Sequence, residues 1–481
     1  MALIEDIRSF PRTFWVANTM ELFERWAYYG MFTVLSVYMT DPLSKGGLGF
    51  SQEERGVMQA VVTGVLYLLP ILGGALADRF GFRKVLLAAF VTLASGYFAM
   101  GHFHAYAPFF VAFLVVAVGG AIFKPIIVGT VSKTTDRKTE TLGFGIFYMI
   151  VNIGGFIGPW AASKMRDLDW NYVFMMCSAV ILINLVLLLF YREPARKRQE
   201  REPLGKTFRH ILSNTLIVLR DLKFVLFLLI VVGFWTMYMQ LFFTVPVYIA
   251  QWIDTSVIYK VLGPLKSAIG ATEDGVGLIR PEMMINIPAF VIILFQLVVS
   301  SLVKGISPVK SMVAGFIVVV AGLGQLYFYI NGWFVVIALV VLAFGEMASS
   351  PRIQEYISTI APPEKVGLYM GYSFLPVAGG NVLGGLLSGQ LYGQLSDKYA
   401  FLRQYLVQGG YEKADAIAGM DDGVLLKQSL EKLNMSNAEL TSTLYDLYHP
   451  GNIWLIFGAI GFFTALCLFL YNRFMLVKPG R

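Results

Sequence analysis

Hydrophobic positions along this chain gather into long, nearly uninterrupted runs that are separated by shorter polar stretches. About twelve of these runs approach or exceed the roughly 20 residues that an α-helix needs to cross a bilayer. They cover residues 14–39, 55–77, 84–103, 107–131, 142–163, 171–191, 224–252, 284–303, 310–330, 333–358, 367–396 and 452–475. The pattern predicts an all-α polytopic membrane protein with about 12 transmembrane helices.

Two polar segments divide these runs. The basic segment 192–223 contains no apolar run of spanning length, and it separates six runs from six. We therefore expect an N-terminal six-helix bundle at 1–191, a cytoplasmic linker at 192–223 and a C-terminal six-helix bundle at 224–481, with a substrate site near the midplane. The second polar segment, at about 397–450, predicts short amphipathic helices in an extracytoplasmic insertion. That insertion is either a structural cap or a surface for a partner.

Composition supports the membrane assignment and limits the function. Of the 481 residues, 57% are hydrophobic and only 14% are charged, whereas soluble domains have about 25% charged residues. The net charge of +7 comes from Lys and Arg in short loops, as is typical of cytoplasmic loops, rather than from a nucleic-acid surface. Loops after the even-numbered runs contain more Lys and Arg than most loops after the odd-numbered runs, which predicts that both termini lie in the cytoplasm. The compact loops favour a bacterial inner membrane.

Several classes of function lack any supporting motif. No phosphate-binding GxxxxGK[ST] loop is present, so ATP is not expected to supply the energy. The residues show neither a metal-ligand spacing nor a nucleophile and base arrangement typical of an enzyme. We expect no cofactor and no metal ion.

Charged residues inside the first apolar run are the most informative polar feature. Glu21, Glu24 and Arg25 lie three and four residues apart, so a helix places them on one face. Each charge in the hydrocarbon region costs about 2.5–3.5 kcal/mol on insertion scales. This cost is tolerable where the three side chains face one another and a polar cavity.

Two further charges fall within later runs. Lys124 lies well inside the fourth run, next to Pro125. It is expected either to reach the cytoplasmic interface with its long side chain or to pair with Glu21 or Glu24. Glu346 lies near the middle of the tenth run and either faces a cavity or stays protonated against a neighbouring helix.

Near the end of the tenth run, Arg352 and Glu355 lie three residues apart. They form either a gate contact with another span or a pair within their own helix.

A glycine-rich basic turn between the second and third runs carries the first family resemblance. Gly74-Ala-Leu-Ala-Asp78-Arg79-Phe-Gly81-Phe-Arg83-Lys84 resembles the GxxxDRxGxRK signature of the major facilitator superfamily. In that family the motif latches the two helix bundles on the cytoplasmic side. The resemblance implies the same role for Asp78, Arg79 and Arg83.

The first run narrows the resemblance. Glu21-Leu-Phe-Glu24-Arg25-Trp-Ala-Tyr28-Tyr29-Gly30 is similar to the ExxERFxYYG motif of proton-dependent oligopeptide transporters, with Trp26 in place of Phe. Matches recur in order along the chain. They include Gly119-Gly120 with Lys124-Pro125, Phe147-Tyr148 with Asn152 and Gly154, Phe234-Trp235 with Gln240, Asn286 with Pro288, Gly345-Glu346, and Gly380-Asn381.

This resemblance implies roles for individual residues. Proton coupling would fall to Glu21, Glu24, Arg25 and Lys124, and Glu346 would receive the amino terminus of a peptide. The substrate-binding positions implied in this sequence are Tyr28, Tyr29, Phe32, Tyr67, Lys124, Tyr148, Asn152, Trp235, Met239, Asn286, Glu346 and Ser373.

Three of these positions depart from the family pattern. Phe32 stands where the family usually has an arginine, so binding of a substrate carboxylate would depend more on Lys124. Met239 replaces a titratable glutamate, and Ser373 replaces a tryptophan. The differences bear on substrate identity more than on fold.

The leading hypothesis is a monomeric symporter that imports di- or tripeptides, or peptide-like molecules, with protons by alternating access. Its partners would be a small-molecule substrate and the lipid bilayer. One alternative keeps the fold but carries another amine or an amphiphile, or works as a proton antiporter or exporter. Another is a membrane scaffold or sensor that uses 397–450 for interactions.

Overall fold

The computed structural model describes residues 2–136, 139–194, 213, 218–273, 275–328 and 330–476. Each of the twelve apolar runs is helical within these residues. The expected linker at 192–223 lies largely outside the described residues.

The described part of the first half is built from α-helices and one short 3-10 helix. They are α1 (Ala2–Ser9), α2 (Arg12–Thr40), η1 (Leu43–Lys45), α3 (Gln52–Leu68), α4 (Pro70–Phe80), α5 (Phe82–His102), α6 (Tyr106–Lys133), α7 (Glu140–Arg166) and α8 (Trp170–Phe190).

The second half has more interruptions. Its elements as far as the tenth run are α10 (Leu222–Tyr238), α11 (Gln240–Phe243), α12 (Val245–Trp252), α13 (Ser256–Val261), η2 (Gly263–Leu265), α14 (Lys266–Ile269), β1 (Ala271–Glu273), β2 (Val276–Leu278), α15 (Pro281–Met284), α16 (Ile287–Val303), α17 (Pro308–Gly324), η3 (Gln325–Tyr327) and α18 (Gly332–Ile360). The remaining elements are η4 (Pro363–Lys365), α19 (Val366–Gly371), η5 (Tyr372–Phe374), α20 (Leu375–Leu395), α21 (Lys398–Gln408), α22 (Ala414–Ile417), α23 (Asp422–Leu433), α24 (Asn437–Tyr448), α25 (Asn452–Tyr471) and the π-helical turn η6 (Asn472–Leu476).

Nine segments in the described part of the chain are long and apolar enough to cross a membrane by themselves. The other three expected spans are helical but less uniform. The charged motif interrupts the apolar sequence of α2. Helix α3 ends just before Pro70, because proline lacks an N–H and clashes with the preceding turn. Helix α20 follows two short helical segments rather than continuing from α19.

The loop between α12 and α15 departs from the all-helical expectation. Strands β1 and β2 form an antiparallel hairpin in which Ala271 pairs with Leu278 and Glu273 with Val276. The short helices predicted for segment 397–450 are present as α21–α24.

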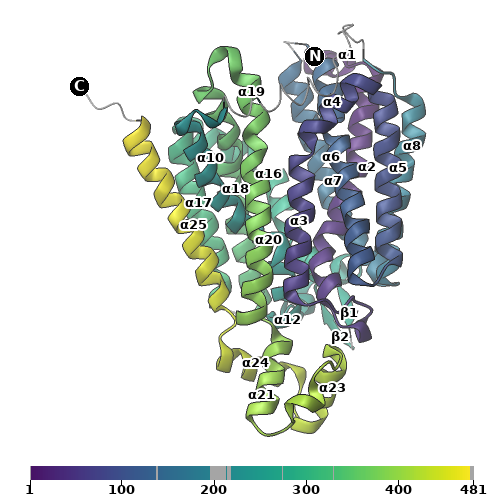
Figure 1. Cartoon of the computed structure of the whole chain (residues 1–481), viewed down its shortest axis with the longest axis vertical. Helices are drawn as coiled ribbons and strands as arrows, with labels where there is room; N and C mark the ends of the chain where they lie inside the picture. The colour runs from purple at the N-terminus through teal and green to yellow at the C-terminus, as the bar shows by residue number, and fades with distance from the viewer. Residues whose placement is uncertain are drawn as a thin grey trace. The chain divides into compact units, whose positions relative to one another are not determined.

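Contacts divide the chain into two compact units. Unit 1 contains residues 1–31, 62–229 and 357–378, and unit 2 contains 32–61, 230–356 and 379–481. Within unit 1, α5 packs along both α6 and α8 (Figure 1). Within unit 2, α17 packs along α25, and α21 contacts α22, α23 and α24.

Candidate functional site

The charged motif of α2 is held in place by close helix packing in unit 1. A Cβ atom at Gly154 of α7 would lie 2.6 Å from the main-chain oxygen of Leu22, and one at Gly158 would lie 2.5 Å from that of Trp26. Only glycine allows the two backbones to approach this closely. The glycine repeat therefore fixes α7 against the turns of α2 that carry Glu21, Glu24 and Arg25.

Four charged side chains meet at this point in a buried network. Arg25 donates to both oxygens of Glu24, with Nε–Oε2 and Nη2–Oε1 distances of 2.5 and 2.8 Å. Its Nε atom also lies 3.5 Å from Oε1 of Glu21. From α6, the Nζ atom of Lys124 donates to the same Oε1 of Glu21 at 2.5 Å. Lys124 thus pairs with Glu21 rather than Glu24.

The network is electrically balanced when all four groups are charged, with two carboxylates and two cations. Both glutamates are fully buried, whereas 36% of the Lys124 side chain is exposed. Oε2 of Glu21 is buried and has no hydrogen-bond partner among the described residues. Since a buried charge is stable only when it is paired, removing any one member leaves the others uncompensated.

Aromatic rings surround the cations of this network. The Arg25 guanidinium lies 4.8 Å from the ring centre of Tyr28 and 5.8 Å from that of Tyr29. Tyr67 of α3 forms a side-chain hydrogen bond with Tyr28. The Lys124 ammonium lies 5.4 Å from the Phe147 ring centre on α7. Cation–π contacts of this kind hold a charge without neutralising it.

Two predicted substrate positions follow Phe147 on α7. Tyr148 has an exposed side chain, and its main-chain oxygen accepts a hydrogen bond from Nδ2 of Asn152 at 2.8 Å. Both residues belong to unit 1, as do the four charged residues.

A second polar pair occupies unit 2. The hydroxyl of Tyr238, the last residue of α10, donates to Oε2 of Glu346 on α18 at 2.6 Å. The sequence analysis assigned a substrate-binding role to Glu346, whereas Tyr238 belonged to a motif that resembles the family and received no role. The aromatic, mostly apolar composition of α10 gave no signal that this hydroxyl reaches a carboxylate on a helix more than 100 residues later.

The other predicted positions of unit 2 lie in packed surroundings. Phe32 is buried against Phe242 and Phe243, with ring centres 5.4 and 6.1 Å apart. Met239 is also buried, and Asn286 is a buried residue at the start of α16. Helix α20 passes so close to Trp235 that a Cβ at Gly380 would lie 2.3 Å from the Trp235 Cβ.

The remaining predicted residues lie in unit 1. Ser373 is buried in η5. In the glycine-rich turn, Gly81 has a φ of +99°, which explains why glycine joins α4 to α5. Arg79 and Arg83 are exposed on either side of that glycine. The side chain of Asp78 lies outside the described part of the structure.

Arg352 and Glu355 form an ion pair within α18, at 2.5 Å. Arg352 also donates to the main-chain oxygen of Val303 at the end of α16. Of the two expected arrangements, the described contacts match the pair within one helix, with an added contact to α16.

Sequence reasoning missed one fully buried cation. Arg55 on α3 donates to the side-chain oxygens of Gln52 and Gln59 and to the main-chain oxygens of Phe243 and Ser388, at 2.7–3.1 Å. These acceptors are all neutral. Arg55 stands at the polar start of an apolar run, where a solvent-exposed arginine is the usual expectation.

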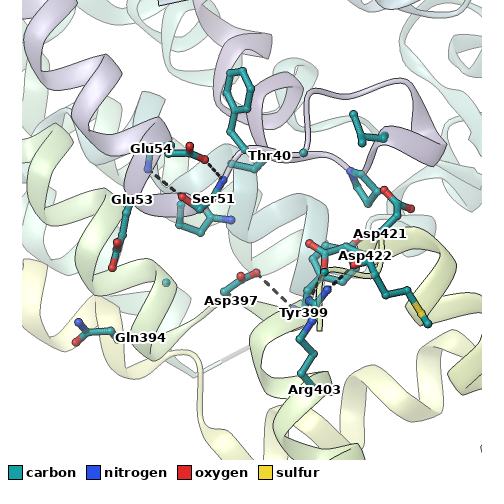
Figure 2. Close-up of a pocket in the computed structure, with 18 residues that line it drawn as sticks. Thr40, Ser51, Glu53, Glu54, Gln394, Asp397, Tyr399, Arg403, Asp421 and Asp422 are labelled. Carbon is teal, nitrogen blue, oxygen red and sulfur yellow. Dashed lines mark hydrogen bonds and ion pairs between the residues drawn. The ribbon is translucent and has the colours of Figure 1, made fainter. Parts of the chain in front are cut away.

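An acidic pocket of about 610 Å³ lies in unit 2 beside the same end of α3 (Figure 2). Its carboxylates come from three separate stretches of chain, and they are Glu53, Glu54, Asp397, Asp421 and Asp422. Several of them have structural roles. Glu54 forms a reciprocal cap with Ser51 at the start of α3, and Asp421 caps α23 while accepting a hydrogen bond from Ser44.

Burial and the neighbouring Asp422 carboxylate raise the pKa of Asp397 to about 6. Asp397 caps α21 and accepts a hydrogen bond from Gln251. Among the described residues, no group of three His, Cys, Asp or Glu side chains is arranged to hold a metal ion.

Comparison with known proteins gives one family match and several relatives. The model of the Major Facilitator Superfamily matches residues 17–259 and 247–403. The peptide transporter YePEPT of Yersinia enterocolitica is 29% identical over 189 residues, which are 38% of this chain and 37% of that protein. A Na⁺, Li⁺, K⁺/H⁺ antiporter of Planococcus maritimus is 25% identical over 389 residues, 77% of this chain and 87% of the relative.

The fold is similar to that of a solved structure of a POT family transporter in complex with 5-aminolevulinic acid. The TM-score is 0.69 and the sequence identity is 18%, and the match covers 98% of this chain and 100% of the other.

Proposed function

Because this chain belongs to the Major Facilitator Superfamily, we propose that it is a proton-coupled symporter that imports di- or tripeptides, or peptide-like molecules, by alternating access. It is a multi-pass membrane transporter of small molecules and not an enzyme. The direction of transport, the coupling ion and the peptide substrate are the parts that we propose.

The observation that carries the proposal is the buried ion pair between Glu21 and Lys124. Oε1 of Glu21 accepts a hydrogen bond from Lys124 and lies near Arg25, while its Oε2 has no partner in the described part of the chain. A proton bound to Glu21 removes one negative charge, so the network changes from neutral to a net charge of +1. The ammonium of Lys124 is then free to bind an anionic group of the substrate.

A peptide has a negatively charged carboxylate at one end and a positively charged ammonium group at the other, and Lys124 and Glu346 carry the opposite charges. Its carboxylate would bind to Lys124, the more exposed of the two cations in unit 1. Separately, the family resemblance assigns the ammonium group of a peptide to Glu346. Lys124 has to bear this role without a first-helix arginine, because Phe32 stands at that position and is buried among aromatic rings.

Sequence similarity supports peptides as the substrate class. YePEPT is described as a peptide transporter, but its alignment with this chain covers little more than a third of either protein. We further propose that the protein works as a monomer in a bacterial inner membrane with both termini in the cytoplasm. The exposed Arg79 and Arg83, together with Asp78, would form the cytoplasmic latch.

Uptake of radiolabelled Ala-Ala into proteoliposomes tests the proposal. An inwardly directed proton gradient should drive accumulation by the wild type. Glu21→Gln should abolish that accumulation but keep counterflow exchange, because an amide still accepts a hydrogen bond and does not titrate. Glu140→Gln, at an exposed position that begins α7, is the matched control. Wild-type protein that exchanges no peptide would refute the substrate class.

A second candidate is cation/proton antiport, which one relative favours. The antiporter of Planococcus maritimus matches 77% of this chain. In proteoliposomes with a pH-sensitive dye trapped inside, an antiporter would move protons when Na⁺ or K⁺ is added, without peptide. Peptide-dependent acidification of the interior favours symport instead. Replacing the ions by amines or amphiphilic drugs in the same assay tests the wider cargo alternative.

A further inference from the structure

Tyr238 is held rigidly where its hydroxyl meets Glu346. Its ring contacts two aromatic neighbours of α10, stacked on Phe234 at 5.8 Å and edge-on to Trp235 at 5.5 Å between ring centres. Phe234 is in turn stacked on Phe316 of α17 at 4.1 Å. Only 6% of Tyr238 is exposed. Because packing holds the ring in one orientation, it also fixes the position of the hydroxyl oxygen.

Glu346 is fixed from the other side by the packing of its own helix. A Cβ at Gly345 would lie 2.7 Å from the main-chain oxygen of Gly315, and the reverse distance is also 2.7 Å. This contact locks α18 against α17 at the residue before the glutamate. The Tyr238 ring and the α18 backbone are thus both held by packing. The 2.6 Å hydrogen bond from Tyr238 to Oε2 of Glu346 is therefore fixed by the structure of unit 2.

The bond leaves the carboxylate with two unlike oxygens. Oε2 is occupied by Tyr238, and within the described residues Oε1 accepts no hydrogen bond. An ammonium group is a compact charge that needs only one carboxylate oxygen, whereas a guanidinium binds best as a fork across both oxygens. A hydroxyl held on Oε2 therefore penalises the forked arrangement more than the single contact.

We infer that Tyr238 is a specificity-determining residue that makes Glu346 select ligands with a primary ammonium group over ligands with a guanidinium group. The inference rests on the proposed role of Glu346 as the acceptor of the substrate amine.

Competition against Ala-Ala exchange in proteoliposomes tests it with two matched inhibitors. One is unlabelled Ala-Ala, and the other is N-amidino-Ala-Ala, in which a guanidinium replaces the amine. The wild type should prefer the ammonium form by about tenfold, and Tyr238→Phe should reduce that preference to about twofold. Tyr356→Phe removes another buried hydroxyl of unit 2, which contacts Tyr471, and should leave the preference unchanged.

Thermal unfolding of each variant checks that the protein remains folded. An unchanged preference in folded Tyr238→Phe overturns the inference, and so does an equal change in Tyr356→Phe. Glu346→Gln distinguishes an error in the proposed role of Glu346 from an error in the role of Tyr238. If it leaves the affinity for Ala-Ala intact, the proposed role of the carboxylate is wrong and the inference falls with it. If Glu346→Gln weakens the binding of Ala-Ala but Tyr238→Phe does not change the preference for ammonium over guanidinium, only the inference about Tyr238 is wrong.

Discussion

Lys124 on α6 and Glu21 on α2 share an ion pair in which a single carboxylate oxygen, Oε1, lies 2.5 Å from the ammonium nitrogen. The same oxygen is 3.5 Å from Arg25. One acceptor atom thus contacts two cations, while the second oxygen of Glu21 is buried and has no partner within the residues that the structure describes. A change in the charge of Glu21 is therefore felt by both cations at once.

Glu24→Gln should abolish proton-driven uptake. Both oxygens of Glu24 accept from Arg25, so the amide loses the charge that fixes the guanidinium and leaves the network with an excess positive charge. We expect accumulation of Ala-Ala to fall at least about tenfold, equivalent to about 1.4 kcal/mol. The measurement is uptake under an imposed pH gradient. Accumulation equal to wild type would remove Glu24 from the coupling network.

Lys124→Gln should weaken the binding of substrates that carry a free carboxylate. The variant retains a polar side chain but has no charge to attract an anion. We expect the concentration of Ala-Ala needed for half-maximal exchange to rise at least about tenfold. The affinity for its C-terminal amide should change little. Lys304→Gln, at an exposed position after α16, is the control. An equal loss for both ligands would contradict a role in carboxylate binding.

Arg55→Leu should destabilise the protein. The guanidinium is fully buried, and its loss leaves the main-chain oxygens of Phe243 and Ser388 without this donor. Each buried acceptor that loses its charged donor lowers stability by about 1–3 kcal/mol. The free energy of unfolding should therefore fall by about 3 kcal/mol. Chemical denaturation in detergent micelles measures it. Lys45→Leu, an exposed cation, should change it by less than about 0.5 kcal/mol.

Asp397→Asn should change the pH dependence of stability. Burial raises the pKa of Asp397 from 3.8 to about 6, so the folded protein binds this proton more tightly than the unfolded chain. The contribution to stability is therefore lost as pH rises from about 4 to about 6. The asparagine variant retains the cap of α21 and lacks this loss, so it should unfold at a higher temperature than wild type at pH 7.

Thermal unfolding at pH 4 and pH 7 measures this difference. At pH 4 the wild-type side chain is mostly protonated when folded, so the gain from Asp397→Asn should be smaller than at pH 7. Asp415→Asn, at an exposed position in α22, should show no such difference between the two pH values. A larger gain at pH 4 than at pH 7 would contradict the raised pKa.

Much of the fold was predictable because it depends on local composition. Each of the twelve predicted apolar runs is helical within the described residues, since a membrane leaves backbone groups no partner except their own helix. Helix breaks were less predictable. Pro70 accounts for the end of α3 by its chemistry, whereas α19 is held by contacts of Tyr369 with Asp221 and Phe224, which lie more than 100 residues earlier. The β1–β2 hairpin is a local pairing that the sequence analysis did not predict.

The sequence by itself determined that Glu21, Glu24 and Arg25 share one face of a helix, because a period of 3.6 residues leaves no other arrangement. Only the tertiary structure decided that Lys124 pairs with Glu21, that Arg55 is buried among neutral oxygens and that Tyr238 occupies one oxygen of Glu346. Each of these arrangements includes a hydrogen bond between residues more than 100 positions apart. Their partners are set by helix packing, in particular by close glycine contacts such as that between Gly315 and Gly345, and periodicity along one helix contains no information about it.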